Sequence, residues 1–268
     1  MGSALLSTKR LDGRTRNDDL IQIGCAKIRV PSIHNPAQLE AVMINTAGWV
    51  TGGDRLDWHF AAGAETRLTV TSQACERLYK STGQRASIAV DLRVETGAQL
   101  NWLPQETILF DHCNAHRKID ADLNDNARLL LVEPHVFGRR AMNEVVRNCF
   151  LQDDWRIRHR GMLVHSEALR LEGDMDAHLQ QIAVASAASA VAAIVLLETL
   201  GNGRLESCVQ PARDLLGSSG GVSLIKQGQT GKLIARLVAK DSYTLRKSLI
   251  PLIQLLNEGA QMPKCWAL

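Results

Sequence analysis

The sequence predicts a mainly β protein with about two α-helices in the C-terminal third. Three observations lead to this fold class. Polar and apolar residues alternate through the first two thirds of the chain, a weak repeat recurs inside that region, and helical periodicity replaces alternation near the C-terminus.

Alternation is clearest at residues 26–30, 67–71 and 87–94, where apolar side chains occupy every second position. Period-two alternation is typical of strands with one buried face. Glycine, asparagine and aspartate cluster between these segments, which indicates turns.

The repeat consists of a turn residue and an alanine ahead of an apolar segment. It occurs at Gly63-Ala64, Gly97-Ala98 and Asn126-Ala127. An interval of about 30 residues is typical of stacked β units. Three degenerate copies are equally compatible with a chance series of hairpins.

The last third predicts helices at residues 205–216 and 242–256, because their apolar residues share one helical face. Asp241 or Ser242 can cap the second helix, and Pro251 inside it is expected to introduce a kink.

Between these helices, residues 222–225 and 232–238 predict a hairpin around Gly228 and Gly231. The uncharged run at residues 182–197 is shorter than the roughly 20 apolar residues of a membrane-spanning helix, so a buried strand or core helix is expected there.

A single domain is expected over residues 1–268, because no linker rich in proline, glycine or serine divides the chain. We expect a β-rich body at about residues 20–175 and a βαββα-like portion at about residues 180–260.

Composition limits the classes of function. The 268 residues are 45% hydrophobic and 22% charged, as in an ordinary globular protein. The net charge of +3 is small and the basic residues are scattered, which argues against a nucleic-acid-binding protein. Six cysteines without a C-x-x-C pair, and an N-terminus without a long apolar core, predict a cytoplasmic protein with reduced thiols and no membrane association.

Motifs for common enzyme chemistry are missing. The glycine-rich residues 48–54 lack the Gly-Lys-Ser/Thr of a P-loop and end in Asp54, and neither G-x-S-x-G nor H-E-x-x-H occurs. His112-Cys113 with His116 is the most metal-like cluster, but a polar loop explains it better.

Several strings, in consistent order and spacing, resemble the urease accessory protein D family over nearly the whole chain. They are Asn45–Gly48 running into Gly52-Gly53-Asp54, Thr71–Ser81, Trp102–Asp111, Glu133 with Phe137–Met142 and Glu144, and an ending with Leu245-Arg246, Leu249, Pro251-Leu252, Pro263 and Trp266.

Within these strings we assign motif or structural roles to ten residues: Gly48, Gly52, Gly53, Gln73, Tyr79, Pro104, Gln105, Glu106, Gly138 and Arg139. The chain departs from the family at Trp49 and Asn143, where glycine is usual. A positive φ at position 49 would therefore strain the tryptophan.

The resemblance implies an elongated, β-solenoid-like fold and no catalysis. It implies a scaffold or chaperone in urease maturation and nitrogen metabolism. Its partners would be the F-type accessory protein, a nickel-carrying G-type GTPase reached through that protein, and the urease apoprotein subunits. No permanently bound cofactor is implied, and Ni²⁺ would bind only transiently during its insertion into urease.

Oxygen-bearing residues in the matching strings are candidates for a nickel path. They are Asp54, Glu133 and Glu144, with Ser72 and Glu76 as weaker candidates. Oxygen ligands suit a divalent cation that must also leave. Structural pairing with arginine explains the carboxylates equally well, through Arg55, Arg77, Arg139 and Arg140.

Two further classes of function stay open at this point. One is a β-solenoid enzyme that acts on a small substrate with paired carboxylates. The other is an interaction module with no role in metal traffic.

Overall fold

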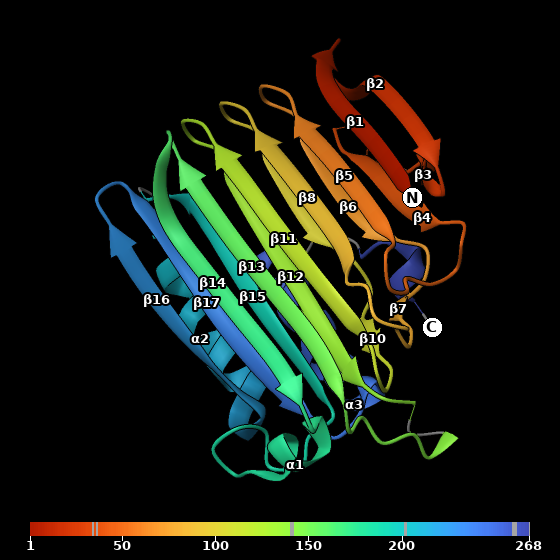
Figure 1. Cartoon of the computed structure of the whole chain (residues 1–268). Coiled ribbons are helices and arrows are strands. Elements are labelled where there is room, and N and C mark those ends of the chain that lie inside the picture. The colour runs from red at the N-terminus through yellow and green to blue at the C-terminus, as the bar shows by residue number, and fades with distance from the viewer. Residues whose placement is uncertain (34, 36, 140–141, 201–202, 259–261, 268) are drawn as a thin grey trace.

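The computed structural model describes residues 1–33, 35, 37–139, 142–200, 203–258 and 262–267. Two β-sheets pack face to face, and helices α2 (Arg204–Leu216) and α3 (Ser242–Leu256) cover the outer face of one of them (Figure 1). The chain is mainly β, as the alternation predicted.

Sheet A contains, in spatial order, β14 (Met162–Gly173), β13 (Cys149–His159), β11 (Asn114–Leu123), β8 (Ala86–Val94), β5 (Arg55–Ala62), β1 (Gly2–Leu11) and β2 (Arg14–Gly24). Sheet B contains β16 (Gly220–Gln227), β17 (Thr230–Ala239), β15 (Ala190–Thr199), β12 (Arg128–Phe137), β9 (Gln99–Leu103), β6 (Arg67–Ser72), β4 (Leu39–Asn45) and β3 (Ala26–Arg29). The short strands β7 (Glu76–Leu78) and β10 (Thr107–Leu109) extend sheet B beside β12.

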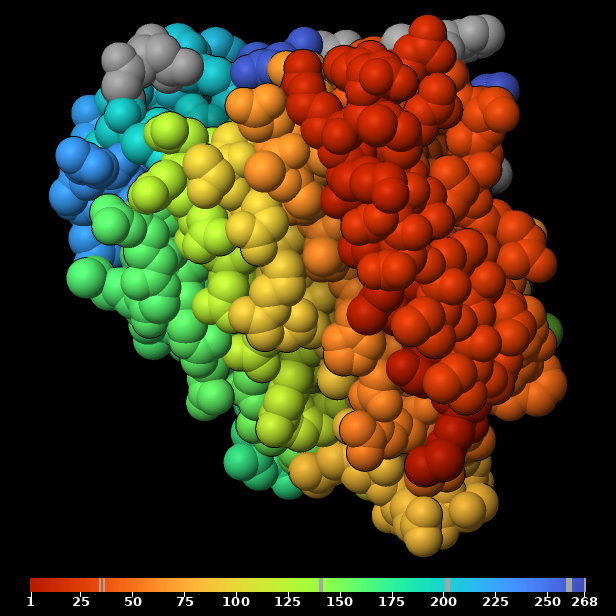
Figure 2. All heavy atoms as spheres, turned by 90° about the horizontal axis from the view of Figure 1, so that it is seen from above, coloured from red at the N-terminus to blue at the C-terminus, as the bar shows by residue number. Residues whose placement is uncertain are grey.

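The chain winds between the sheets in stacked coils. In sheet A, β1, β5, β8, β11 and β13 are parallel neighbours, and in sheet B, β4, β6, β9 and β12 are parallel neighbours. Viewed from above, the chain colours follow one another across the molecule from the N-terminal to the C-terminal side (Figure 2). The predicted β-solenoid-like stacking is therefore confirmed.

The repeat corresponds to the turns that lead into sheet B. Gly97 and Asn126 have φ of 68° and 54°, and the residues two positions later pair in register across β9 and β12. The first copy was aligned wrongly by two residues, because the stacked turn residue there is Glu65, with φ of 56°. Gly63 has a different role, since a Cβ at that position would lie 2.1 Å from the Thr8 carbonyl oxygen.

Two hydrophobic clusters stabilise this arrangement. The larger fills the space between the sheets and includes Trp58, Phe60, Trp102 and Trp155. The smaller joins sheet B to α2 and α3 and includes Trp266, which lies in a short 3₁₀ turn (Lys264–Trp266). Because sheet B is covered on both faces, its central strand β12 is buried along nearly its whole length.

The C-terminal predictions are largely confirmed. Both helices form within one residue of the expected bounds, and the Asp241 carboxylate caps α3 by accepting a 2.7 Å hydrogen bond from the Thr244 amide. Strands β16 and β17 form the expected hairpin, with Gly228 in its turn at φ of 57°. The short helix α1 (Met175–Gln180) was not predicted.

The uncharged run was predicted correctly only in its second half. Strand β15 begins at Ala190 and is mostly buried, whereas Ile182 is 89% exposed and Val184 lies on the surface. None of the helices in the described part of the chain has the length and apolarity needed to cross a lipid bilayer.

The two departures from the family pattern have different structural consequences. Trp49 is absent from the positive-φ residues of the described chain, so the strain considered for it does not arise. Its half-exposed ring lies 5.6 Å from that of Tyr79. Asn143 does adopt a positive φ of 54°, a conformation that asparagine tolerates better than most residues other than glycine.

Candidate functional site

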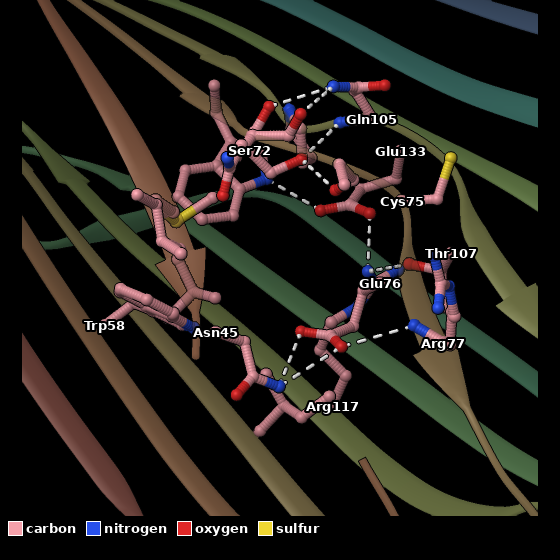
Figure 3. A pocket seen from close by; sticks show the side chains of 18 of the residues that line it. Asn45, Trp58, Ser72, Cys75, Glu76, Arg77, Gln105, Thr107, Arg117 and Glu133 are labelled. Carbon is pink, nitrogen blue, oxygen red and sulfur yellow. Dashed lines mark hydrogen bonds and ion pairs between the residues drawn. The ribbon is translucent and has the colours of Figure 1, made fainter. Parts of the chain in front are cut away.

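A cavity of about 230 Å³ lies at the end of the coils beside β7 and β10. Its rim includes the exposed residues Gly48 and Gln73, and its interior is lined by inward-facing side chains of both sheets, among them Trp58 and Trp102. The space therefore connects the surface with the interior between the sheets, and Figure 3 shows side chains that line it.

The rim is held by hydrogen bonds between the ends of β6 and β9. The Ser72 hydroxyl accepts a 2.9 Å hydrogen bond from the Gln105 amide N–H. The Gln105 side-chain Nε2 donates to the carbonyl oxygens of Ser72 and Gln73, at 3.0 and 2.9 Å. These bonds place several oxygen atoms at one side of the cavity (Figure 3).

Glu76 lies at the start of β7 and contributes a carboxylate to the cavity wall. Its oxygen Oε1 accepts hydrogen bonds from Asn45 Nδ2, at 3.3 Å, and from the Arg77 amide, at 3.2 Å. Burial raises the pKa of Glu76 above its usual range, which weakens its preference for the charged form.

Glu133 forms the inner end of the cavity, where it is 1% exposed. Its Oε1 accepts a 2.6 Å hydrogen bond from the indole Nε1 of Trp102, and its Oε2 lies 2.5 Å from Nη1 of Arg117. Burial raises the pKa of Glu133 to about 7, against the opposing attraction of Arg117.

Arg117 connects Glu133 to a second buried carboxylate. Its Nε donates to Asp153 Oδ1 at 3.0 Å and its Nη2 to Asp153 Oδ2 at 2.5 Å. Although burial opposes ionisation of Asp153, the charge and hydrogen bonds of Arg117 lower its pKa below the usual value. When Glu133 is ionised as well as Asp153, two carboxylates around one guanidinium leave a net negative charge at the inner end of the cavity.

His135 contributes no positive charge to this cluster. Arg117 Nη2 lies 2.9 Å from His135 Nε2, and because arginine only donates, Nε2 must accept. The imidazole is therefore neutral, with its proton on Nδ1. Burial, and then the charge of Arg117, lower the pKa of His135 to about 4.

Three of the five candidate residues meet at this cavity, namely Ser72, Glu76 and Glu133. Asp54 does not line it: Asp54 Oδ2 accepts a 2.9 Å hydrogen bond from the Thr51 amide within its own turn. Asp54 is nevertheless close enough for its charge to contribute to the raised pKa of Glu76.

The surroundings of Glu144 fit the structural alternative, in which an arginine pairs with the carboxylate. Its Oε2 accepts hydrogen bonds from the backbone N–H and Nε of Arg139, at 3.0 and 2.9 Å. Gly138, with φ of 73°, makes the turn that begins this loop. Glu144 lines a separate hollow next to α1. Arg55 pairs with Asp57 rather than with Asp54, and Arg140 lies outside the described residues.

The other motif residues divide into two groups. Gly48, Gln73, Pro104 and Gln105 line the cavity. The remaining residues lie outside the lining of this cavity: Gly52, Gly53, Tyr79, Glu106, Gly138 and Arg139. Among these, the ring of Tyr79 lies 4.3 Å from that of Phe110 on the next coil, and the Arg139 guanidinium lies 4.3 Å from the centre of the Phe110 ring.

Sequence reasoning missed Arg117 and Asp153 and treated His135 as isolated. The alternation of polar and apolar residues in β11 and β13 could have revealed Arg117 and Asp153. Arg117 shares a strand face with Ala115 and Ile119, and Asp153 shares one with Leu151 and Trp155. A charged residue on an apolar strand face must find a buried partner.

The His112-Cys113-His116 cluster does not form a metal site. His116 Nε2 lies 2.9 Å from Asp154 Oδ2 on the outer face of sheet A, whereas His112 occupies a turn with φ of 63°. Within the part of the chain that the structure describes, no group of three or more His, Cys, Asp or Glu residues has a geometry that could hold a metal ion. All six cysteines are free thiols.

The fold and cavity define a class of protein: a two-sheet, β-solenoid-like protein with an apolar interior, into which opens a cavity that carries the carboxylates of Glu76 and Glu133. Comparison with known families assigns the chain more narrowly. The model of the UreD urease accessory protein family matches residues 1–267, and the chain belongs to that family. Its membership indicates a role in urease maturation.

Individual relatives agree with this assignment. The urease accessory protein UreD of Rhizobium rhizogenes is 44% identical over all 268 residues, which cover 95% of that protein. UreD of Rhizobium johnstonii is 45% identical with the same coverage, and UreD 1 of Brucella melitensis is 44% identical over 94% of its length.

Proposed function

We propose that this chain is a non-enzymatic, cytoplasmic scaffold that helps to transfer nickel to the urease active site. In this proposal it binds the F-type accessory protein, through it the G-type GTPase, and the urease apoprotein. Nickel passes through the cavity between the sheets, with Glu76 and Glu133 as successive transient ligands.

The observation that supports this proposal is the position of Glu133. It carries a carboxylate at the inner end of a cavity whose rim is exposed, and the cluster around it has a net negative charge when both acids are ionised. Such a site attracts a divalent cation from the rim toward the interior.

Weak ligation suits this role. Glu76 and Glu133 already accept hydrogen bonds or ion pairs from Asn45, Trp102 and Arg117. A cation must compete with these donors, so its residence at either carboxylate is short. Oxygen ligands also bind nickel less tightly than cysteine or histidine clusters do, which favours release.

Co-purification tests the partner assignments. The chain is expressed with the F-type protein, the GTPase and the urease subunits, and the complex is isolated through a tag on this chain. We expect all partners to elute together. Elution of the chain alone, under conditions that keep the partners soluble, would contradict the scaffold role.

A further inference from the structure

The cavity rim is attached to the C-terminal helix by Arg246, a partly buried arginine. Arg246 on α3 donates from Nε to Glu106 Oε1 and from Nη2 to Glu106 Oε2, both at 2.6 Å. The same Nη2 donates to Gln105 Oε1 at 3.0 Å. Glu106 is 1% exposed, so this bidentate pair is shielded from solvent.

The side chain of Gln105 links Arg246 to the rim of the cavity. Its Oε1 faces Arg246, while its Nε2 donates to the carbonyl oxygens of Ser72 and Gln73. Fixing one end of the planar amide fixes the other. Glu106 also accepts a 3.4 Å hydrogen bond from the thiol of Cys75, another cavity-lining residue.

Trp266 makes a second attachment from the C-terminal segment. Its indole Nε1 donates to Thr71 Oγ1 at 3.2 Å and to the Leu103 carbonyl oxygen at 3.1 Å. These acceptors immediately precede Ser72 and Pro104 at the ends of β6 and β9. The Arg246 guanidinium lies 5.3 Å from the centre of the Trp266 ring, so the two attachments also contact each other.

We infer that Arg246 and Trp266 are positioning residues, through which the C-terminal segment holds the rim of the cavity in the arrangement needed for passage. The acceptors of Arg246, Glu106 and Gln105, lie 140 and 141 residues earlier in the chain. Displacement of α3 releases both of them together. A partner that moves the C-terminal segment therefore changes access to the cavity. This role in passage rests on the proposed function, whereas the restraint on the rim stands without it.

A matched control exists at the opposite end of sheet B. Arg128 also ties α3 to this sheet, through a hydrogen bond to the Leu256 carbonyl oxygen and an ion pair with Glu198. It makes no contact with the residues that form the rim. Arg128→Gln therefore weakens the attachment of α3 while leaving the rim contacts in place.

Hydrogen–deuterium exchange of the purified full chain tests the restraint. In Arg246→Gln and Trp266→Phe we expect peptides covering residues 72–76 and 104–107 to exchange about tenfold faster, because their anchoring hydrogen bonds are lost. In Arg128→Gln the same peptides should exchange as in wild type. Unchanged exchange in Arg246→Gln, or equal acceleration in Arg128→Gln, would overturn the inference.

The nickel content of urease in the assembled complex then tests the consequence for passage. We expect Arg246→Gln to lower it at unchanged complex yield, and Glu106→Gln in the same chain to cause little further loss, because both changes remove one interaction. If Glu133→Gln lowers nickel content but Arg246→Gln does not, the role of the rim in passage is refuted. If neither changes it, the proposed function fails, and exchange alone decides whether Arg246 restrains the rim.

Discussion

Arg117 on β11 and Glu133 on β12 form an ion pair across the interior, with 2.5 Å between Nη1 and Oε2, although their strands belong to different sheets. The pair joins the two layers at the inner end of the cavity. It therefore links the stability of the fold to the chemistry of the candidate nickel path.

Replacing Arg117 should be strongly destabilising. Arg117→Met leaves Glu133 and Asp153 as neighbouring buried carboxylates without their shared cation, which we expect to lower the free energy of unfolding by about 3–5 kcal/mol. Urea denaturation measures this loss. The exposed Arg170, paired with Glu172, is the control, and its replacement by Met should change stability by no more than about 1 kcal/mol. Equal effects of the two changes would contradict a buried ion-pair network.

The raised pKa of Glu133 predicts a specific pH dependence. Burial raises its pKa to about 7 in the fold, so its contribution to stability is fully present below its unfolded pKa and is lost as pH rises through 7. Glu133→Gln does not titrate. Its stability relative to wild type should therefore increase by about 2 kcal/mol between pH 5 and 8. Stability curves that remain parallel over this range would show that the pKa of Glu133 is not raised.

The glycine pair beside Asp54 should tolerate substitution poorly. A Cβ at Gly52 would lie 2.1 Å from Ser81 Oγ and 2.4 Å from the Gln84 carbonyl oxygen, and Gly53 has φ of 84°. Gly52→Val and Gly53→Val should each cost more than about 2 kcal/mol. Trp49→Gly removes one half-exposed ring and should cost less. Thermal unfolding ranks the three variants, and valine variants as stable as Trp49→Gly would refute this account of the turn.

The isolated protein should hydrolyse neither urea nor nucleotides. The sequence lacks a P-loop, and the described residues contain no metal-holding cluster of His, Cys, Asp or Glu. Ammonia and phosphate release are measured with purified protein. Turnover above background, abolished by a point mutation in this chain, would contradict a non-enzymatic scaffold.

Alternation and turn residues were enough to predict a β-rich chain, because each coil repeats the same local rules, whereas its solenoid-like stacking was implied by the family resemblance. Asn126 and Gly97 show this well, since both occupy the positive-φ turn before a strand of sheet B. The first copy was misaligned because Glu65 takes the same conformation without being a typical turn residue. Ile182 was misjudged because hydrophobicity alone does not reveal which part of an apolar run is covered by other elements.

The site was only partly predictable for a different reason. Glu133 and Glu76 lie in the strings that resemble the family, whereas Arg117 and Asp153 lie on strands whose pairing brings them together over long sequence distances. Glu144 shows the structural alternative that was left open. Its string groups it with the path, and its carboxylate pairs with Arg139, five residues earlier in the chain.

The nickel content of urease activated in the presence of cavity variants tests the central claim most directly. Glu76→Gln and Glu133→Gln are compared with Glu172→Gln, which changes an exposed acid outside the cavity lining, in complexes of equal yield. We expect both cavity variants to lower nickel per urease active site several-fold while the control matches wild type. Wild-type nickel content in fully assembled complexes of both cavity variants would contradict passage through this cavity.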